Sequence, residues 1–288
     1  MDYNKINERF YSQNYWTIDR SENKWFSKYV KVKIIDKWIR GINKGVLYDA
    51  GGGVGNYAAY FGKRFSKVIV SDISKIALSK IPEEYIEKLN CSILDNKLPD
   101  NYVDCIFLID VFEHIDTKDL LKMMKDLKRI LKPDGRIIIF TSHFGMGLGA
   151  VIQRISNPKK RLLGNEYKEG HVNRLKYKEF EKLFEEAELE IDNFYFYSIF
   201  FQQITDKIKD TFAIIVSRIK GWQNLDIALG RLGQKTKENF RKKETKIIFK
   251  VPLILLSWIS YLDIVLFGKW FPGNSIFFSL KKKKHLHK

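Results

Sequence analysis

The sequence predicts an α/β protein built on a doubly wound, mainly parallel sheet. Segments of strand length alternate with segments of helical periodicity through the first two thirds of the chain, and residues 103–109 are almost continuously apolar. Such runs are typical of strands that helices cover on both faces, and alternating strands and helices favour parallel pairing. The third observation is a glycine cluster directly after the first predicted strand, where such sheets place a ligand-binding turn.

The predicted elements alternate regularly up to residue 140. Apolar residues three to four positions apart predict helices at 25–42, 57–65, 73–81 and 120–131. Short apolar runs predict strands at 46–49, 68–72, 91–95, 103–109 and 136–140. Further along the chain we expect a helix at 177–187, an aromatic-rich strand at 191–201 and a final strand at 275–280.

These elements suggest four parts of the chain. Residues 1–44 would form an N-terminal helical lid, and residues 45–199 would form the core of the α/β domain. Residues 200–272 break the alternation, and we expect them to be a helical insertion, apolar and basic, before the final strand. Residues 273–288 would carry that strand and a basic tail.

The composition excludes several classes of protein. With 45% hydrophobic residues and six prolines among 288 residues, the chain is neither disordered nor fibrous. Two cysteines without a Cys-x-x-Cys spacing predict neither a disulfide scaffold nor a zinc–thiolate site. The first residues do not have the pattern of a signal peptide. We therefore expect a cytoplasmic protein.

The positive charge of the chain is concentrated near its end. The net charge is +17, and residues 191–288 hold 18 Lys and Arg against 7 Asp and Glu, a net charge of +11. The same third of the chain holds the longest apolar runs. A basic and apolar region favours either a nucleic acid or a membrane surface as a partner.

The segment LYDAGGGVGNY, residues 47–57, is the strongest local signal. Its glycines allow a sharp turn after the strand and a close approach to a ligand, and the next helix points its N-terminus at that ligand. A dinucleotide-binding loop would have glycine where Asn56 stands. Asp49 would repel a pyrophosphate and attract a cationic amine, so S-adenosylmethionine fits better than NAD.

Two more aspartates follow strand ends. Asp72 can accept hydrogen bonds from ribose hydroxyls, and the alternative is a cap for the helix that starts near Ser74. Asp95, at the predicted end of the third strand, is placed to meet an adenine amino group, although an ordinary turn aspartate is almost as good an interpretation.

Four segments in order resemble the class I S-adenosylmethionine-dependent methyltransferases, in their small-molecule branch. They are LYDAGGGVGNY, VIVSDIS, SILDNKLPDNYVDCIFLIDVFEHI and LKRILKPDGRIIIFTS. The resemblance implies a Rossmann-like sheet of seven strands, the last antiparallel, and S-adenosylmethionine as the cofactor. It implies the methionyl part near Asp49 and the glycines, the ribose at Asp72, the adenine near Asp95 and the sulfonium beside Asp110. The expected cofactor-binding residues are Asp49, Gly51, Gly53, Gly55, Asp72, Ile73, Leu94, Asp95 and Asp110.

Methyl transfer mainly needs alignment of the acceptor with the methyl group, and a base only where the acceptor loses a proton. The candidate bases are His143 and His171, in the segments where the resemblance implies an acceptor pocket. Surface loop histidines are the alternative for both. Asp110, Glu113 and His114 would share one face of a helical turn and suggest a metal site, but we favour backbone hydrogen bonding there and predict no metal.

Residues 251–268, VPLILLSWISYLDIVLFG, form the longest apolar run. Basic residues at 241–246 and the aromatic residues Trp258, Tyr261 and Trp270 are typical of a helix at a membrane interface. A helix buried in a lid or in a dimer interface is the second interpretation. A membrane-spanning helix is the third, and it is disfavoured by the short run and by Asp263.

We therefore predict an enzyme, an S-adenosylmethionine-dependent methyltransferase acting on a small or lipid-linked acceptor, most readily at a hydroxyl oxygen. Peripheral membrane contact through residues 245–272, at the inner face of the membrane, would accompany it. Two alternatives remain open. One is an RNA methyltransferase, disfavoured because nucleic-acid partners rarely require so long an aliphatic run. The other is a non-catalytic protein of the same fold that binds a membrane or a partner.

Overall fold

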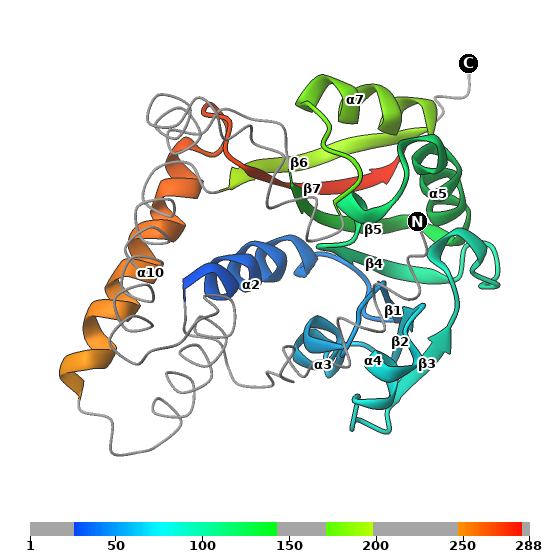
Figure 1. Ribbon diagram of the computed structural model, residues 1–288, viewed down its shortest axis with the longest axis horizontal. Coiled ribbons are helices and arrows are strands. Elements are labelled where there is room, and N and C mark those ends of the chain that lie inside the picture. The colour runs from blue at the N-terminus through cyan, green and yellow to red at the C-terminus, as the bar shows by residue number, and fades with distance from the viewer. Residues whose placement is uncertain (1–25, 143–170, 198–246, 284–288) are drawn as a thin grey trace, which may run out of the picture.

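The structure is a computed structural model that describes residues 26–142, 171–197 and 247–283 (Figure 1). Its centre is a sheet of seven strands in the order β3-β2-β1-β4-β5-β7-β6. The strands are β1 (Val46–Ala50), β2 (Lys67–Asp72), β3 (Ile86–Asn90), β4 (Val103–Ile109), β5 (Leu131–Ser142), β6 (Leu189–Tyr197) and β7 (Ser275–Lys282). Strands β1 to β5 pair in parallel, and β7 runs antiparallel between β5 and β6. The predicted α/β class and the antiparallel last strand are confirmed.

Helices cover both faces of this sheet. They are α2 (Phe26–Ile39), α3 (Asn56–Gly62), α4 (Lys75–Ser79), α5 (Thr117–Ile130), α7 (Tyr177–Glu186) and α10 (Ile247–Phe267), with the 3₁₀ turns η1 (Ile93–Asp95) and η2 (Phe112–His114). One hydrophobic cluster joins α5 and α7 to the sheet, and a second joins α2, α3, α4 and residue Ile264 of α10 to the opposite face. Strand β4 supplies residues to both clusters, which is why its sequence is apolar on both faces apart from Asp104.

The one charged residue of β4, Asp104, is explained by its partners. Its carboxylate accepts a hydrogen bond from the backbone N–H of Val46, with an N–O distance of 2.7 Å, and pairs with the ammonium of Lys132 at 2.7 Å. A buried carboxylate is tolerated when it is paired and hydrogen-bonded in this way. Asp104 therefore ties β1, β4 and β5 together.

The third strand lies a few residues earlier in the chain than the sequence predicts. Residues 91–95 were expected to be a strand, but β3 ends at Asn90 and residues 93–95 form η1. The hydroxyl of Ser92 accepts a hydrogen bond from the N–H of Leu94 at 3.2 Å, which favours a turn over an extended chain. Asp95 consequently lies in a 3₁₀ turn and not at the end of a strand.

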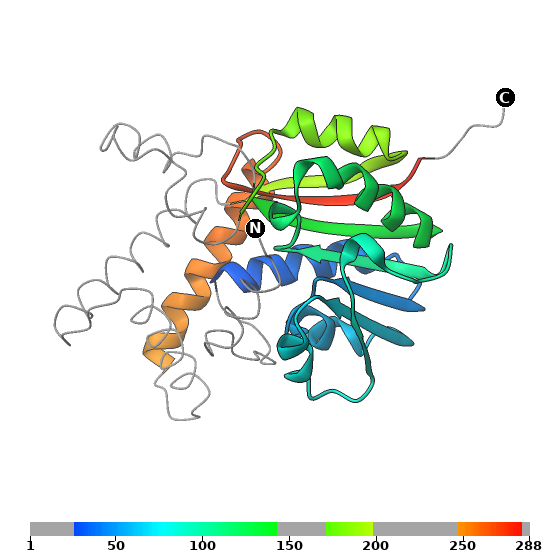
Figure 2. The same ribbon diagram turned by 45° about the vertical axis from the view of Figure 1, so that its right-hand side comes forward.

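Helix α10 lies between β6 and β7 in the chain, within the predicted insertion, and packs beside α2 (Figures 1 and 2). Gly268 joins its end to β6, because the carbonyl of Gly268 accepts the N–H of Phe196 at 2.7 Å. The buried part of α2, from Val30 to Ile39, belongs to the hydrophobic core. Helix α2 lies in the predicted N-terminal lid, and it is therefore also one of the helices that cover the sheet.

The joint at Gly268 has no room for a side chain. A Cβ there would lie 2.4 Å from the carbonyl oxygen of Ile264 and 2.9 Å from that of Phe196, whereas a Cβ at Gly41 would meet nothing within 4 Å. We expect Gly268→Ala to lower the free energy of unfolding by about 1–3 kcal/mol, since the backbone must move. Gly41→Ala should change it by less than about 0.5 kcal/mol. Chemical denaturation of both variants checks this, and equal midpoints would contradict it.

Candidate functional site

The glycine loop after β1 makes its turn with three glycines in the left-handed region. Gly51, Gly53 and Gly55 have φ angles of 69°, 54° and 69°, which side chains other than glycine rarely adopt. The N–H of Gly52 donates to the carbonyl of Ser71 at 3.0 Å, which joins the loop to β2. The loop leads into α3, which begins at Asn56. The structure thus brings the three predicted glycines into one turn at the carboxyl end of β1.

Asp49 lies buried beneath this loop. One of its carboxylate oxygens accepts the N–H of Ala58 in α3, with an N–O distance of 3.2 Å. A Cβ on Gly52 would stand 2.7 Å from the carboxyl carbon of Asp49, so only glycine fits above it. Burial, and to a smaller extent the charge of Asp72, raise the pKa of Asp49 to about 7. A buried carboxylate of this kind gains from a cationic partner.

Asp72 joins the glycine loop to the turn after β2. Its carboxylate accepts the N–H of Gly53 at 2.9 Å and the N–H of Ser74 at 2.8 Å, and burial raises its pKa. The hydroxyl of Ser74 accepts the N–H of Ala77 and caps α4, so Ser74, and not Asp72, is the N-cap. Each carboxylate oxygen keeps a second lone pair for a ligand hydroxyl. Ile73 follows directly and is half-buried.

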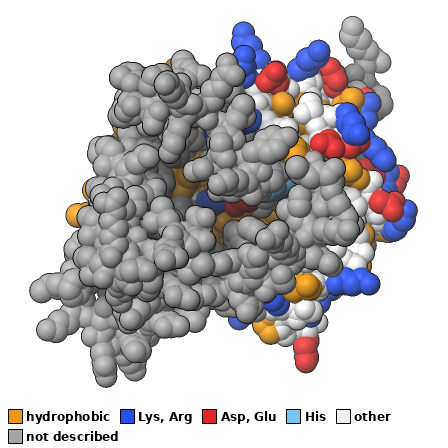
Figure 3. All heavy atoms as spheres, viewed as in Figure 1, with side chains coloured by type: hydrophobic (Ala, Val, Ile, Leu, Met, Phe, Trp, Pro, Cys, Tyr) orange, Lys and Arg blue, Asp and Glu red, His pale blue; other side chains and the backbone are white. Residues whose placement is uncertain are grey.

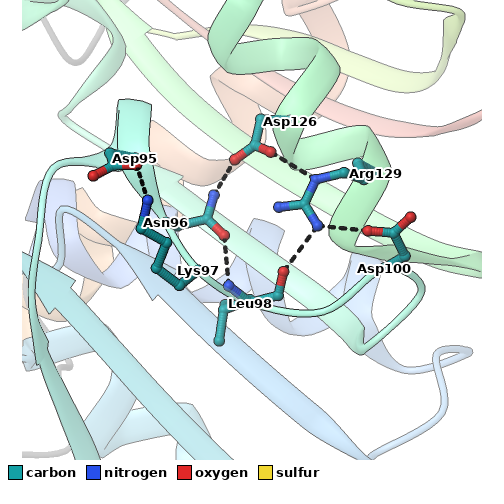
Figure 4. A network of polar contacts seen from close by, with 7 residues as sticks. All are labelled: Asp95, Asn96, Lys97, Leu98, Asp100, Asp126 and Arg129. Carbon is teal, nitrogen blue, oxygen red and sulfur yellow. Dashed lines mark hydrogen bonds and ion pairs between the residues drawn. The ribbon is translucent and has the colours of Figure 1, made fainter.

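Asp95 lies apart from this pair of carboxylates. Its side chain is exposed and pairs with the ammonium of Lys97, which lowers the pKa of Asp95. Leu94, next to it, is half-buried. Figure 4 shows how the following residues hold this segment. Asn96 bonds to Asp126 of α5, whose carboxylate accepts Arg129 Nε at 2.8 Å. The structure therefore fixes the segment at the edge of the domain without bringing Asp95 to the other acids.

Asp110 follows β4 in a strained conformation. Its φ of 57° lies in the left-handed region, which non-glycine residues adopt rarely, aspartate more often than most. Lys31 of α2 binds its carboxylate with N–O distances of 2.7 and 3.1 Å, and the same ammonium lies 3.7 Å from the centre of the Phe140 ring. Sequence reasoning missed Lys31, because nothing in the sequence near it indicates a partner 79 residues away.

The turn after Asp110 lies against the glycine loop. A Cβ on Gly51 would stand 2.8 Å from a methyl group of Val111, so that the valine occupies the space that a side chain would need. Residues 110–114 are thereby held beside the predicted cofactor site. In the part of this face that the described residues form, acidic, basic and histidine side chains lie near one another (Figure 3).

Three potential ligand residues converge at η2. One ligand atom from each of Glu113, His114 and His171 lies within 4.8 Å of the other two. The rings of His114 and His171 meet edge to face with centroids 4.9 Å apart. Among the described residues, this is the cluster with a composition and spacing suited to a metal ion.

Hydroxyl groups and backbone bonds hold this cluster. Thr141 Oγ1 donates to the buried Glu113 carboxylate at 2.9 Å and Ser142 Oγ donates at 3.4 Å. The N–H of Val172 donates to the carbonyl of Glu113 at 2.9 Å. Asn173 Nδ2 donates to the carbonyl of Phe112 at 2.8 Å. The chain at 171–173 is thus docked onto the turn at 112–115.

Of the two candidate bases, His143 lies outside the described residues, and His171 lies in the cluster. Burial, and then the neighbouring His114 and Arg174, lower the pKa of His171 to about 4. At neutral pH the imidazole is therefore uncharged. A group of so low a pKa is a weak acceptor for the proton of a hydroxyl.

Comparisons with known proteins address the class of the protein. Residues 48–139 match the family "Methyltransferase domain". No curated protein matches the sequence. The family match confirms the predicted resemblance to class I methyltransferases, the predicted enzyme class and S-adenosylmethionine as the cofactor of that class.

Solved structures resemble the fold at low sequence identity. A phosphoethanolamine N-methyltransferase of Haemonchus contortus, in complex with phosphomonomethylethanolamine and S-adenosylhomocysteine, has a TM-score of 0.57 and 17% identity over 99% of this chain and 61% of its own. Geranyl diphosphate methyltransferase in complex with S-adenosylmethionine has a TM-score of 0.54 and 13% identity over 88% and 84%. The YcgJ protein of Bacillus subtilis has a TM-score of 0.52 and 16% identity over 89% and 100%. This chain spans less than two thirds of the Haemonchus enzyme.

The buried Asp49 makes stability depend on pH. Because its pKa is about 7 in the folded chain and 3.8 in the unfolded chain, the folded state binds more protons between these values. Stability should therefore fall as the pH rises from about 4 to about 7, by a few kcal/mol, since one pKa unit corresponds to about 1.4 kcal/mol. Asp49→Asn should flatten this part of the profile.

Thermal or chemical unfolding between pH 4 and pH 8, without ligand, measures the effect. The matched control is Asp100→Asn, because Asp100 is exposed and, among the described residues, pairs with the half-buried Arg129, which Asp126 also holds. An Asp49→Asn profile that keeps the slope of the wild-type profile would contradict the assignment.

Proposed function

We propose that this chain, whose residues 48–139 form a methyltransferase domain, transfers the methyl group of S-adenosylmethionine to a hydroxyl oxygen of a small or lipid-linked acceptor. The observation that carries the proposal is the arrangement of two buried carboxylates around three left-handed glycines: Asp49 lies below the loop, and Asp72 holds it from the side. Such a site offers negative charge to an ammonium group, whereas the two carboxylates would repel a pyrophosphate.

In this proposal each part of S-adenosylmethionine, the methyl donor, has its own binding residues. Asp49 attracts the methionyl ammonium, the close backbone of Gly51, Gly53 and Gly55 accommodates the methionyl chain, and Asp72 accepts the ribose hydroxyls. Asp110 lies beside the sulfonium, where Lys31 balances its charge in the absence of ligand. Ile73, Leu94 and Asp95 form the adenine side, and Asp95 would have to exchange Lys97 for the adenine amino group.

The reaction itself is a displacement at carbon. The acceptor oxygen forms a bond to the methyl carbon as the carbon–sulfur bond breaks, and the bonding electrons pass to the sulfur. The products are the methyl ether, S-adenosylhomocysteine and the proton of the hydroxyl. The protein contributes alignment and exclusion of water. His143 and His171 stay the proposed proton acceptors, although burial lowers the pKa of His171 to about 4 and makes it a weak acceptor in the free protein.

Lysines against aromatic rings support an anionic or lipid-linked acceptor. The ammonium of Lys269 lies 4.1 Å from the centre of the Phe194 ring, and that of Lys37 lies 3.5 Å from the hydroxyl of Tyr195. Within the described ranges, no carboxylate pairs with Lys37 or Lys269. Burial, and then Lys37, lower the pKa of Lys269, as expected of cations that share a site without an anion.

The orientation of α10 supports peripheral membrane contact through residues 245–272. Its polar residues Ser260 and Asp263 are buried, so they face the protein. Its exposed side is a row of apolar residues, and the turn after the helix continues it. These residues, the apolar row, are Leu255, Trp258, Leu262, Leu266, Phe267, Trp270 and Phe271.

A monomeric protein rarely exposes so long an apolar row without a partner. The flanking cations and the tryptophans suit the surface of an anionic bilayer. Among the residues that the structure describes, no helix is both long enough and apolar enough to cross a bilayer.

Binding of S-adenosylhomocysteine tests the donor site. We expect Gly53→Val to abolish binding, because a β-branched residue cannot adopt the φ of 54° without strain. Asp49→Asn should weaken binding about tenfold or more, because the ammonium loses its counter-charge. Isothermal titration calorimetry measures both, with Asp100→Asn as the control of unchanged affinity. No affinity in the wild type would end the proposal.

Two further results separate the alternatives. Methyl transfer to RNA with a steep dependence on salt would favour an RNA methyltransferase. Binding of S-adenosylhomocysteine without methyl transfer to any small-molecule, lipid or RNA fraction would favour a non-catalytic protein of the same fold.

Flotation with lipid vesicles tests the membrane contact. We expect the wild type to float with vesicles that contain anionic phospholipid, and Leu262→Gln/Leu266→Gln to stay in the soluble fraction, because the apolar row is interrupted. The matched control is Tyr85→Ser, since Tyr85 is equally exposed and lies next to β3 at the other edge of the sheet. Equal flotation of the double variant and the control would contradict the contact.

A further inference from the structure

Two histidines and a buried carboxylate meet at the end of the sheet, beyond the residues expected to bind the cofactor. Glu113 and His114 belong to η2, and His171 comes from a segment 57 residues further along the chain. One potential ligand atom of each lies within 4.8 Å of the others. The convergence is a product of the fold, because hydrogen bonds dock residues 171–173 on η2.

This combination of ligands is specific in its chemistry. Two imidazoles and one carboxylate are a common set for catalytic zinc, which keeps a further position open, and for other divalent transition metals. Magnesium and calcium prefer oxygen ligands. Ligand atoms around zinc, at about 2.0–2.2 Å from the ion, stand roughly 3–3.5 Å apart. Small side-chain rotations would bring the ligand atoms of Glu113, His114 and His171, which lie within 4.8 Å of one another, to this spacing.

The surroundings of the cluster resemble the support of a metal site. Hydrogen bonds from neighbouring groups commonly fix the orientation of metal ligands. Here Thr141 and Ser142 each donate a hydroxyl to one oxygen of the Glu113 carboxylate. Glu113 is almost fully buried, whereas both histidines are partly exposed, so that an ion could approach from the histidine side.

We propose that Glu113, His114 and His171 bind a divalent transition-metal ion, with zinc as the best match, and that the open position of this ion takes the acceptor's hydroxyl oxygen. The prediction from sequence was no metal, because the contribution of His171 was not visible there. The role in catalysis rests on the proposed function, whereas the binding of the ion does not.

The site would supply an activating group for the hydroxyl nucleophile. An ion acting as a Lewis acid favours loss of the hydroxyl proton, which passes to water, because His171 then serves as a ligand of the ion in place of a base. The oxygen then bonds to the methyl carbon, the carbon–sulfur bond breaks, and S-adenosylhomocysteine leaves with the electron pair on sulfur. The position is suitable, because Val111 of the same turn contacts the glycine loop at Gly51.

Zinc binding to the full chain tests the proposal. The protein is stripped with a chelator, dialysed and titrated with zinc chloride by calorimetry, and we expect one ion per chain. Glu113→Gln, His114→Ala and His171→Ala should each weaken binding by about tenfold or more, since loss of even a supporting group commonly weakens a site about 10–100-fold. Magnesium should bind far more weakly than zinc.

The basic tail contains two other histidines that could bind zinc loosely. His285→Ala/His287→Ala is therefore the matched control, and we expect it to keep the wild-type affinity. Substitution of zinc by cobalt gives a second readout, because the visible absorption bands report nitrogen and oxygen ligands and should be lost in His114→Ala and His171→Ala.

Binding of S-adenosylhomocysteine in each variant shows whether it is folded. The proposal is overturned if the wild type binds no zinc in one-to-one ratio, if His114→Ala and His171→Ala bind as the wild type does, or if only the tail variant loses the ion. A protein that binds zinc as expected but not S-adenosylhomocysteine would contradict the proposed function and leave the metal site standing.

Discussion

The carboxylate of Asp72 joins the two loops on which the candidate site depends. It accepts one N–H from the glycine loop after β1 and one from the turn after β2, and both bonds are buried. These bonds add to the backbone bonds of the loop, such as that from Gly52 to Ser71, and help to hold the loop over Asp49. A buried carboxylate is stabilised by such N–H donors. The geometry of the donor site therefore follows from one side chain at the end of β2.

The order of the strands also brings the residues after β4 next to the glycine loop. Strand β4 lies between β1 and β5, so the residues after β4 meet the glycine loop on one side and the end of β5 on the other. Val111 contacts Gly51, while Glu113 accepts hydroxyls from Thr141 and Ser142 of β5. The proposed donor site and the proposed metal site are thus adjacent because ligands of parallel sheets gather at the carboxyl ends of the strands.

The orientation of α10 in the structure changes how the positive charge of the chain is interpreted. A net charge of +17 could indicate a nucleic acid partner. Among the side chains of α10 that the structure describes, Ser260 and Asp263 are buried and the apolar row is exposed, and Lys269 follows at the end of the helix. The polarity of this helix is the reverse of that expected for a helix on the surface of a soluble protein. An apolar surface with cations at its border suits a lipid bilayer better than a nucleic acid.

The sequence by itself determined the fold class, the strands that precede the glycine loop, Asp72 and Asp110, and the glycine turn, because these depend on periodicity and on backbone preferences within a few residues. Asp49, the glycines and Asp72 lie together because they belong to one βαβ unit. Only the tertiary structure decided the contacts between distant segments: Lys31 with Asp110, and His171 with Glu113 and His114. It also decided which side of α10 faces outward. Such contacts depend on strand order, register and the docking of loops, and no local pattern in the sequence encodes them.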